Sequence, residues 1–414
     1  MNIVVINAYV RENAGDAALL SVCLSQVREA FPDADVAVAG MEDAAVHPEF
    51  EGVRNIGSLR RYVADGTVSL PRRLMRKALV GMAGAVAVAL PRPLRRTLLR
   101  ALPAEARREA EAVSRADLVV SMGGGYVLAR PGLDGYQNVF FVLLPALLAQ
   151  KAGVPVVWAP QSFGPFPAAA QRRLVGHVMR RSAAVLARED VSVGELLACG
   201  IPEEHIERAV DAGFAFAPGR AVAWRDRLGV GPGERLVGVT ARRWLAPTAQ
   251  DRYERELART IDAVQATGAR VVLIPQVSTD YLGDDDRVCE RRIAAHCTSG
   301  PLMVDEVVDY RDLKGLYDEC GLLIGTRFHS VIFSLTSEVP CVAIEYEHKT
   351  RGIMADLELS AWVLPIADVT HERLWALVEP LLEDPGPYRA LLDKNLPGYV
   401  DRALSLPARL RECV

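Results

Sequence analysis

The stretch CGLLIGTRFHSVIFSL, residues 320–335, joins a short apolar run to a helical pattern through a polar junction. CGLLIGT (320–326) has the length and composition of a buried strand, and SVIFSL (330–335) has the apolar spacing of the start of a helix. A buried strand that turns directly into a helix is the repeating unit of a parallel sheet. The stretch therefore predicts an α/β fold.

The same rhythm of strand and helix recurs along the chain, with turn residues at the boundaries. In the first half the predicted strands are 3–8, 35–40, 117–122, 154–160 and 183–188, and the predicted helices are 16–30, 136–152, 168–181 and 190–199. A second series of predicted strands follows at 235–241, 269–275, 301–306, 320–326 and 340–346.

Length and composition predict two domains. The chain has 414 residues and is 50% hydrophobic, which is enough for two cores, since a single core seldom grows beyond about 250 to 300 residues. A segment rich in Gly, Pro and Ala, residues 213–234, is interpreted as a linker between domains 1–212 and 235–414. We expect two Rossmann-like domains that face each other across a cleft.

Charge and cysteine usage exclude several classes of function. The net charge of -4 and the pI near 6.1 argue against a nucleic-acid partner. Seven cysteines form no CxxC pair, and no cluster of His, Cys and Asp has the spacing of metal ligands, so no metal site is expected. Residues 1–6 are predicted to be a strand rather than a secretory signal, which favours a cytoplasmic protein with free thiols.

Residues 71–108 do not follow the alternation of predicted strands and helices. Ten basic residues surround the apolar run ALVGMAGAVAVAL (78–90), which is too short to span a bilayer, since a span takes about 20 residues. One interpretation is a helical insertion packed on the first domain. The other is a basic amphipathic element that lies on anionic lipid at the membrane surface, which would suit a lipid-linked substrate.

Ligands of open α/β sheets bind beyond the carboxyl ends of the strands, often at helix N-termini. Three polar or glycine-rich stretches of the first domain lie at such places, and each also has a structural explanation as a helix cap or a tight turn. The candidate residues are Asn13, Gly15 and Asp16 after the first strand, Gly123, Gly124 and Gly125 after the third, and Gln161 after the fourth.

A fourth candidate is the junction between 320–326 and 330–335, which contains Arg327 and His329. An arginine in a core costs several kcal/mol unless its charge is paired, so Arg327 should face an anion or a wet cleft. His329 can exchange a proton near neutral pH, as a general acid or base must. The alternative for His329 is a core or capping residue.

The stretch GTRFHSVIFSLTSEVPCVAIEYEHKTRGIMADLEL (325–359) resembles the C-terminal signature of the polysaccharide pyruvyl transferases, in which Arg-x-His opens a helix and Tyr-x-x-Lys begins a later one. Other motifs of the family follow in order along nearly the whole chain. These are Asn13 to Asp16, the glycines 123–125, Gln161 to Pro165, Arg188 with Glu189, Asp211 to Phe214, and Arg242.

The resemblance implies a GT-B-like fold and a reaction that adds phosphoenolpyruvate to two sugar hydroxyls, giving a cyclic pyruvate ketal and phosphate without a cofactor. The acceptor would be a sugar of a cell-surface polysaccharide or glycolipid precursor, with the first domain on the acceptor side and the second on the donor side. In this reading Arg327, Arg242 and Lys349 bind the donor anion, His329 is the acid, Asp16 activates the acceptor, and Glu345 binds a hydroxyl.

Each assignment has a structural alternative. Arg242 could cap a strand end, Lys349 could be a solvated helix residue, and Glu345 could belong to a polar rim. The same scaffold also suits a glycosyltransferase that uses a nucleotide sugar, or a non-catalytic glycan-assembly protein. We expect a cytoplasmic location, with peripheral contact at the inner face of the membrane if residues 71–108 bind lipid. The acceptor and the oligomeric state are left open by the sequence.

Overall fold

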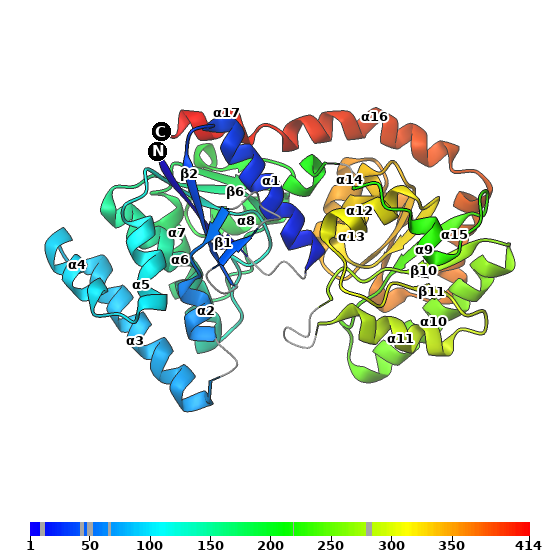
Figure 1. Ribbon diagram of the computed structural model, residues 1–414, viewed down its shortest axis with the longest axis horizontal. Helices are drawn as coiled ribbons and strands as arrows, with labels where there is room; N and C mark the ends of the chain where they lie inside the picture. Colours follow the sequence, from blue (N-terminus) through cyan, green and yellow to red (C-terminus); the bar gives the residue numbers. More distant parts are fainter. Residues whose placement is uncertain (9–12, 42–44, 48–52, 65–67, 218, 279–283) are drawn as a thin grey trace. The chain divides into compact units, whose positions relative to one another are not determined.

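The computed structural model describes residues 1–8, 13–41, 45–47, 53–64, 68–217, 219–278 and 284–414 (Figure 1). The chain divides into two compact units, each built on its own sheet. Unit 1 comprises Met1–Val10, Leu19–Ala212 and Arg402–Val414, whereas unit 2 comprises Arg11–Ala18 and Gly213–Asp401.

Unit 1 contains, within the described residues, an eight-stranded sheet in the order β3-β4-β2-β1-β5-β6-β7-β8. Neighbouring strands are parallel except for β3 and β4. Central strands such as β5, with the sequence LVVS, are fully buried, as parallel strands covered on both faces must be. The strands are β1 Asn2–Ala8, β2 Asp35–Gly40, β3 Ala45–His47, β4 Val53–Asn55, β5 Leu118–Ser121, β6 Val156–Gln161, β7 Ala184–Ala187 and β8 Glu207–Arg208.

The helices of unit 1 cover this sheet and include the basic insertion. The insertion is helical, as predicted, and α3 packs on α6, where a Cβ added to Gly84 would lie 2.8 Å from a methyl group of Leu144. The close approach of the two helices therefore depends on a small residue. The helices are α2 Leu59–Ala64, α3 Leu70–Ala89, α4 Arg92–Arg100, α5 Ala104–Val113, α6 Leu133–Ala152, α7 Ala169–Met179, α8 Asp190–Ala198 and α17 Leu406–Glu412.

Unit 2 contains, in its described part, a six-stranded parallel sheet in the order β11-β10-β9-β12-β13-β14. The strands are β9 Leu236–Thr240, β10 Arg270–Leu273, β11 Leu302–Met303, β12 Leu322–Gly325, β13 Cys341–Glu345 and β14 Val363–Pro365. The helices are α9 Trp224–Leu228, α10 Pro247–Ala266, α11 Asp286–His296, α12 Tyr310–Asp318, α13 Phe328–Thr336, α14 His348–Asp356, α15 His371–Glu383 and α16 Gly386–Ala403, whose last residues belong to unit 1.

Both sheets have the doubly wound strand order of a Rossmann fold. In unit 2 the chain moves outward from β9 to β10 and β11, and then returns to add β12, β13 and β14 on the other side of β9. In unit 1 the corresponding reversal lies between β1 and β5. A ligand of such a sheet binds where the order reverses, beyond the carboxyl ends of the two strands. The topology therefore directs attention to the residues after β9 and β12.

All ten predicted strands are present; that at 35–40 has the expected ends, and the ends of the others lie within three residues of those expected. The sequence did not predict β3, β4, β8 and β14, which are two or three residues long. Strands of this length are too short for alternation or an apolar run to stand out from a loop.

The boundary between the units differs from the predicted domains in two respects. Helix α1, Ala14–Ala30, begins in unit 2 and continues into unit 1. Residues 213–234, interpreted as a linker, belong to unit 2, where the Trp224 side chain is buried and its Nε1 donates to the carbonyl oxygen of Asp312 at 2.7 Å. Composition rich in Gly, Pro and Ala does not distinguish a packed irregular segment from a free one.

Candidate functional site

The reversal point of the unit 2 sheet positions two arginines. Arg242 follows β9 by two residues, and Arg327 follows β12 by two residues as the residue that precedes helix α13. Between them, the Thr326 backbone N–H donates to Thr240 Oγ1 at 2.9 Å, which joins the ends of the two strands. The sheet itself therefore brings these arginines, far apart in the sequence, to one edge.

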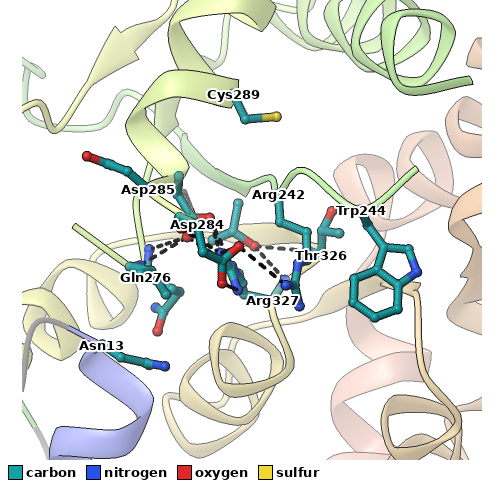
Figure 2. A network of polar contacts seen from close by, with 12 residues as sticks. Asn13, Arg242, Trp244, Gln276, Asp284, Asp285, Cys289, Thr326 and Arg327 are labelled. Atoms are coloured by element: carbon teal, nitrogen blue, oxygen red, sulfur yellow. Dashed lines mark hydrogen bonds and ion pairs between the residues drawn. The ribbon is translucent and has the colours of Figure 1, made fainter. Parts of the chain in front are cut away.

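The Arg327 guanidinium is buried and paired with two carboxylates (Figure 2). Its Nε donates to both oxygens of Asp286, at 2.9 and 3.0 Å, and its Nη1 donates to Asp284 Oδ2 at 3.1 Å. Burial acts to lower the pKa of Arg327, but the charges of Asp286 and Asp284 raise it, so the ion pair is retained. The partners of Arg327 in this structure are therefore protein carboxylates, which satisfies the need for a paired charge.

Asp286 and Asp284 have different roles in this network. Asp286 is buried and accepts from the backbone N–H groups of Gln276 and Val277, at 3.1 and 3.0 Å, which fixes it as part of the scaffold. Asp284 Oδ1 lies 3.0 Å from Arg327 Nη2 and 3.4 Å from Arg242 Nη2, and the Asp284 side chain is 35% exposed. Two guanidinium groups thus converge on one accessible anionic oxygen.

Arg242 is held between aromatic rings. The carbon centre of its guanidinium lies 4.2 Å from the ring centroid of Tyr346 and 4.8 Å from that of Trp244. Its side chain is 12% exposed, and among the described residues no group accepts from its buried Nε. A buried donor of this kind is usually satisfied in native proteins, so Arg242 retains capacity to bind an anion.

The N-terminus of α1 packs against His329. A Cβ added to Gly15 would lie 2.1 Å from His329 Nδ1, so only glycine fits at this position. Asn13 Oδ1 caps the helix by accepting from the N–H groups of Gly15 and Asp16, at 3.1 and 3.3 Å, and the Ala14 N–H donates to the Gln276 carbonyl at 2.9 Å. Asn13, not Asp16, is therefore the capping residue.

These contacts join two motifs that lie more than 300 residues apart in the sequence. The sequence predicted Asp16 in the domain opposite to that of His329, whereas Arg11–Ala18 belong to unit 2 with His329. His329 is half-buried, as is Asp16, which lies one residue after the glycine that touches the imidazole. A helix N-terminus favours negative charge, so the imidazole lies beside an element suited to an anion.

Lys349 and Glu345 come from the next strand and helix. Lys349 Nζ lies 2.7 Å from Glu347 Oε2 and 5.2 Å from the centroid of the Phe328 ring. Burial acts to raise the pKa of Glu347, but the charge and hydrogen bond of Lys349, together with the charges of Arg242 and His348, lower it. Glu345 pairs with Arg351, whose Nε donates to it at 3.0 Å. Lys349 therefore lies near Phe328, the residue between Arg327 and His329. Glu345 belongs to a separate ion pair with Arg351.

The candidates of unit 1 lie at the carboxyl ends of β5 and β6. A Cβ added to Gly123 would lie 2.6 Å from the Pro160 carbonyl oxygen, and Gly124 has a φ of 149°, so both positions require glycine for backbone reasons. Gln161 is fully buried, and in the described part of the chain neither its Oε1 nor its Nε2 has a hydrogen-bond partner. Gln161 is the residue of this group with unused polar capacity.

Nearby in unit 1, motif residues form a buried network. Arg188 pairs with Asp211 and with Glu189, whose Oε2 lies 3.2 Å from Arg188 Nε, and Arg188 Nε also donates to Ser162 Oγ at 2.9 Å. The Arg-Glu and Asp-x-x-Phe motifs of the sequence are therefore partners in one structural ion pair, which supports the loop after β6.

The carboxylates that hold Arg327 were not predicted from the sequence. Asp284, Asp285 and Asp286 form an acidic triplet, but such runs are usually solvated and the pattern gave no indication of a buried partner. The contact between Trp244 and Tyr346 was not predicted either; their rings lie 4.9 Å apart with Arg242 against both.

The described residues contain neither a cluster of metal ligands nor a helix able to span a membrane. Among them no group of three or more His, Cys, Asp or Glu side chains is arranged to hold a metal ion. In the same part of the chain no helix combines the length and the apolar character needed to cross a bilayer.

Comparison with known proteins points to a family. A family model described as polysaccharide pyruvyl transferase matches residues 13–348. The amylovoran biosynthesis protein AmsJ of Erwinia amylovora is 27% identical over 301 residues, which cover 69% of this chain and 70% of the relative. The matched range includes every candidate site residue except Lys349, which follows it by one position.

Solved structures share the fold. A UDP-N-acetylglucosamine 2-epimerase from Neisseria meningitidis, bound to UDP-GlcNAc, superposes with a TM-score of 0.58 at 11% identity over the whole of both chains. Anabaena HepE in complex with UDP-glucose gives a TM-score of 0.58 at 13% identity, again over both whole chains. A putative UDP-N-acetylglucosamine 2-epimerase from Listeria monocytogenes gives 0.60 at 13% identity, covering 98% of this chain and 94% of that one. At such identities the likeness shows the fold alone, and it confirms the GT-B-like class with two Rossmann-like units.

Proposed function

This chain belongs to the polysaccharide pyruvyl transferase family, and we propose that it transfers the pyruvyl group of phosphoenolpyruvate to two hydroxyls of a sugar. The product is a cyclic pyruvate ketal on a precursor of a cell-surface polysaccharide or glycolipid, and phosphate is released. The name of AmsJ, a protein of amylovoran biosynthesis, supports polysaccharide synthesis as the setting.

The observation that carries this proposal is the convergence of Arg327 and Arg242 on one oxygen of Asp284, at 3.0 and 3.4 Å. Asp284 Oδ1 stands where a carboxylate or phosphate oxygen of the donor would bind. Guanidinium groups suit such anions because they donate in a planar fork. Since Asp286 neutralises part of the Arg327 charge, Arg242 and Lys349 supply the remaining attraction for the donor.

The reaction requires one proton for carbon and one for the leaving group. Protonation of the donor methylene at C3 by His329 makes C2 electrophilic, and a sugar oxygen then bonds to C2. The C2–O bond to phosphate breaks, and the second sugar hydroxyl closes the ketal. Each sugar hydroxyl loses one proton. One of these protons restores His329, which gave its own proton to C3, and the other leaves with the phosphate.

Asp16 is the proposed base for an acceptor hydroxyl. It lies in the first turn of α1, one residue from Gly15, whose backbone contacts the His329 ring. Acid and base therefore come from elements that pack together in unit 2. Gln161, Gly123, Gly124 and Gly125 are proposed to bind the acceptor, with the unsatisfied amide of Gln161 as the hydrogen-bonding group.

The proposal needs no cofactor or metal and places the reaction in the cytoplasm, where phosphoenolpyruvate is made. The seven free cysteines, most of them buried, suit a reducing compartment. The acceptor is a sugar that is free or carried on a lipid, and nucleic acid is not a partner.

The test is phosphate release from phosphoenolpyruvate by the purified protein, with a lipid-extracted or soluble sugar fraction as acceptor and mass spectrometry of the product. His329→Ala should lower the rate at least about 100-fold, the usual contribution of a positioned general acid. His296→Ala is the matched control, because His296 is the last residue of α11 and its Nε2 lies 3.8 Å from Asp251 Oδ1, outside the proposed site.

Consumption of a sugar nucleotide in place of phosphoenolpyruvate would replace this proposal with a glycosyltransferase on the same scaffold. Turnover with neither donor, at wild-type levels of folding, would favour a non-catalytic role in glycan assembly. Equal rates for the wild type and His329→Ala would remove the histidine from the mechanism while leaving the reaction itself in place.

A further inference from the structure

Helix α3 presents large apolar side chains to solvent along one face. Met75, Leu79, Met82 and Val86 are 63%, 42%, 64% and 48% exposed, and their spacing of four, three and four residues places them on a single stripe. We call these four residues the α3 stripe. Leu70, Leu74 and Leu94 are exposed on the same helix and on the following α4. Contiguous apolar surface of this kind marks an interaction site.

Another face of α3 packs against unit 1. The exposure of the stripe is therefore not caused by a helix that lacks contacts with the rest of the protein. Val80, Ala83, Gly84 and Ala87 are buried, and Gly84 allows the close approach to Leu144 of α6. In Figure 1, α3 and α4 lie at the left edge of unit 1, further out than α5 and α6. The helix is therefore attached to unit 1 through small residues while its large residues face outward.

Charge around the stripe has one sign. Between Asp65 and Glu105 the chain contains no acidic residue and eight basic ones, a local charge of +8 in a protein whose net charge is -4. Arg72 and Arg100 are exposed, Arg73, Arg76 and Lys77 are half-buried, and Arg95 is buried. The eight are Arg72, Arg73, Arg76, Lys77, Arg92, Arg95, Arg96 and Arg100.

We propose that the α3 stripe and its basic neighbours form a docking surface for a bilayer that contains anionic phospholipid. Apolar side chains enter the boundary between headgroups and acyl chains, and exposed arginines such as Arg72 and Arg100 remain at the phosphate level. Charge complementarity selects this occupant, because a protein partner would need an acidic face and a second copy of this chain would bring two basic surfaces together. The proposal concerns attachment to a surface and stands whether or not the pyruvyl transfer is correct.

The test uses the full-length protein and flotation with vesicles of phosphatidylcholine alone or with phosphatidylglycerol added. We expect the bound fraction to be at least about tenfold greater with the anionic vesicles and to fall when salt is raised, because surface charge is screened within about 3 Å at 1 M salt. In the triple variant Met75→Ser, Leu79→Ser, Met82→Ser, binding should fall at least about tenfold, since the apolar contact is removed.

The matched control removes three apolar side chains of similar exposure elsewhere in unit 1, through Val191→Ser, Leu197→Ser and Leu404→Ser, and should bind as the wild type does. Hydrogen exchange of the wild-type protein provides a second measurement that needs no variant, with slower exchange in α3 when anionic vesicles are added.

Three outcomes would overturn the proposal. The first is no flotation of the wild type with anionic vesicles, and the second is equal flotation of the wild type and the stripe variant. The third is that the wild type is a dimer and the stripe variant a monomer, while neither protein binds vesicles. This result would identify a second copy of the chain as the occupant of the α3 stripe.

Discussion

Gly15 has no space for a side chain, because its added Cβ would overlap the imidazole of His329. Without this clash, replacing glycine by alanine near the start of a helix would stabilise the helix by about 1 kcal/mol. The clash with His329 therefore decides whether the substitution stabilises or destabilises the protein. In Gly15→Ala the imidazole must move, and we expect kcat for phosphate release to fall about 10- to 100-fold, because misplacement of a catalytic group by about 1 Å costs this much.

The control for this substitution is Gly194→Ala in helix α8, where an added Cβ meets nothing within 4 Å. Its kcat should equal that of the wild type and its stability should rise by up to about 1 kcal/mol. Normal kcat in Gly15→Ala would show that contact with α1 does not position His329.

Asp284 occupies the oxygen position between Arg242 and Arg327 in this structure, where it competes with an anionic donor. Asp284→Asn removes the competing charge while preserving shape. Because Asp284 is 35% exposed, solvent screens the effect, and we expect the KM for phosphoenolpyruvate to fall about three- to tenfold. Initial rates over a range of donor concentrations measure it.

Asp285→Asn is the neighbouring control, since Asp285 pairs with Arg287, at 2.6 Å, rather than with the site arginines. It should leave the KM unchanged. A raised KM in Asp284→Asn would mean that this carboxylate organises Arg327 for binding rather than competing with the donor.

For individual residues, the sequence predicted where the candidate site lies, but not which side chains bind Arg327. The spacing of Arg327 and His329 at the end of an apolar run indicated a site, because that position is polar against the trend of its surroundings. The ion pair of Arg327 with Asp286 involves residues 41 positions apart and a carboxylate held by backbone N–H groups. Such a pairing depends on tertiary packing, which periodicity does not encode.

Among the elements, helix α2 depends on a carboxyl group from another helix. The Leu59 N–H donates to Glu109 Oε2 at 2.6 Å, so α5 supplies the acceptor for the first turn of α2. Burial raises the pKa of Glu109 to about 8, against weaker opposite effects of the Leu59 hydrogen bond and the Arg60 charge. The carboxyl group is therefore mainly protonated in the folded protein at neutral pH.

A raised pKa makes stability fall as pH rises. In the unfolded chain the pKa of a glutamate is about 4.3, so between about pH 4.3 and 8 the folded state binds more protons. Glu109→Gln keeps the acceptor and removes the titration. Its stability relative to the wild type should therefore increase with pH, by at most about 1.4 kcal/mol per pH unit, and level off above about pH 8.

Melting temperatures at pH 5 and pH 8 test this. The difference between Glu109→Gln and the wild type should be more positive at pH 8, whereas Glu111→Gln, which removes a partly exposed carboxylate, should show no such trend. An equal difference at both values would mean that Glu109 is already ionised in the folded protein.

Elements with a strong apolar pattern were predicted well, and short ones were not. Strands β5, β9 and β12 are continuous buried runs that end at turns, so their existence follows from composition. Edge strands such as β8 and β14 exist because a neighbouring strand offers hydrogen bonds, as in the pairing of Leu186 with Glu207. Their own residues contain little of that information.

For the whole molecule, the same strand order occurs in both sheets, and the second sheet places its arginines where that order reverses. The alternation of strands and helices predicted both Rossmann-like units. It did not predict that Arg402–Val414 belong to unit 1, where Gln26 Nε2 donates to the Ala403 carbonyl at 2.7 Å. The two residues are 377 positions apart in the sequence, so a local sequence pattern does not predict their contact.

The chain passes from one unit to the other after residues 10, 18, 212 and 401. During translation, residues 11–18 leave the ribosome well before β9, β10 and the rest of unit 2 have been made. Unit 1 in turn needs Arg402–Val414, which are made after every residue of unit 2. Unit 1 therefore cannot complete its contacts before unit 2 has been synthesised, unlike an N-terminal domain made from a single run of residues.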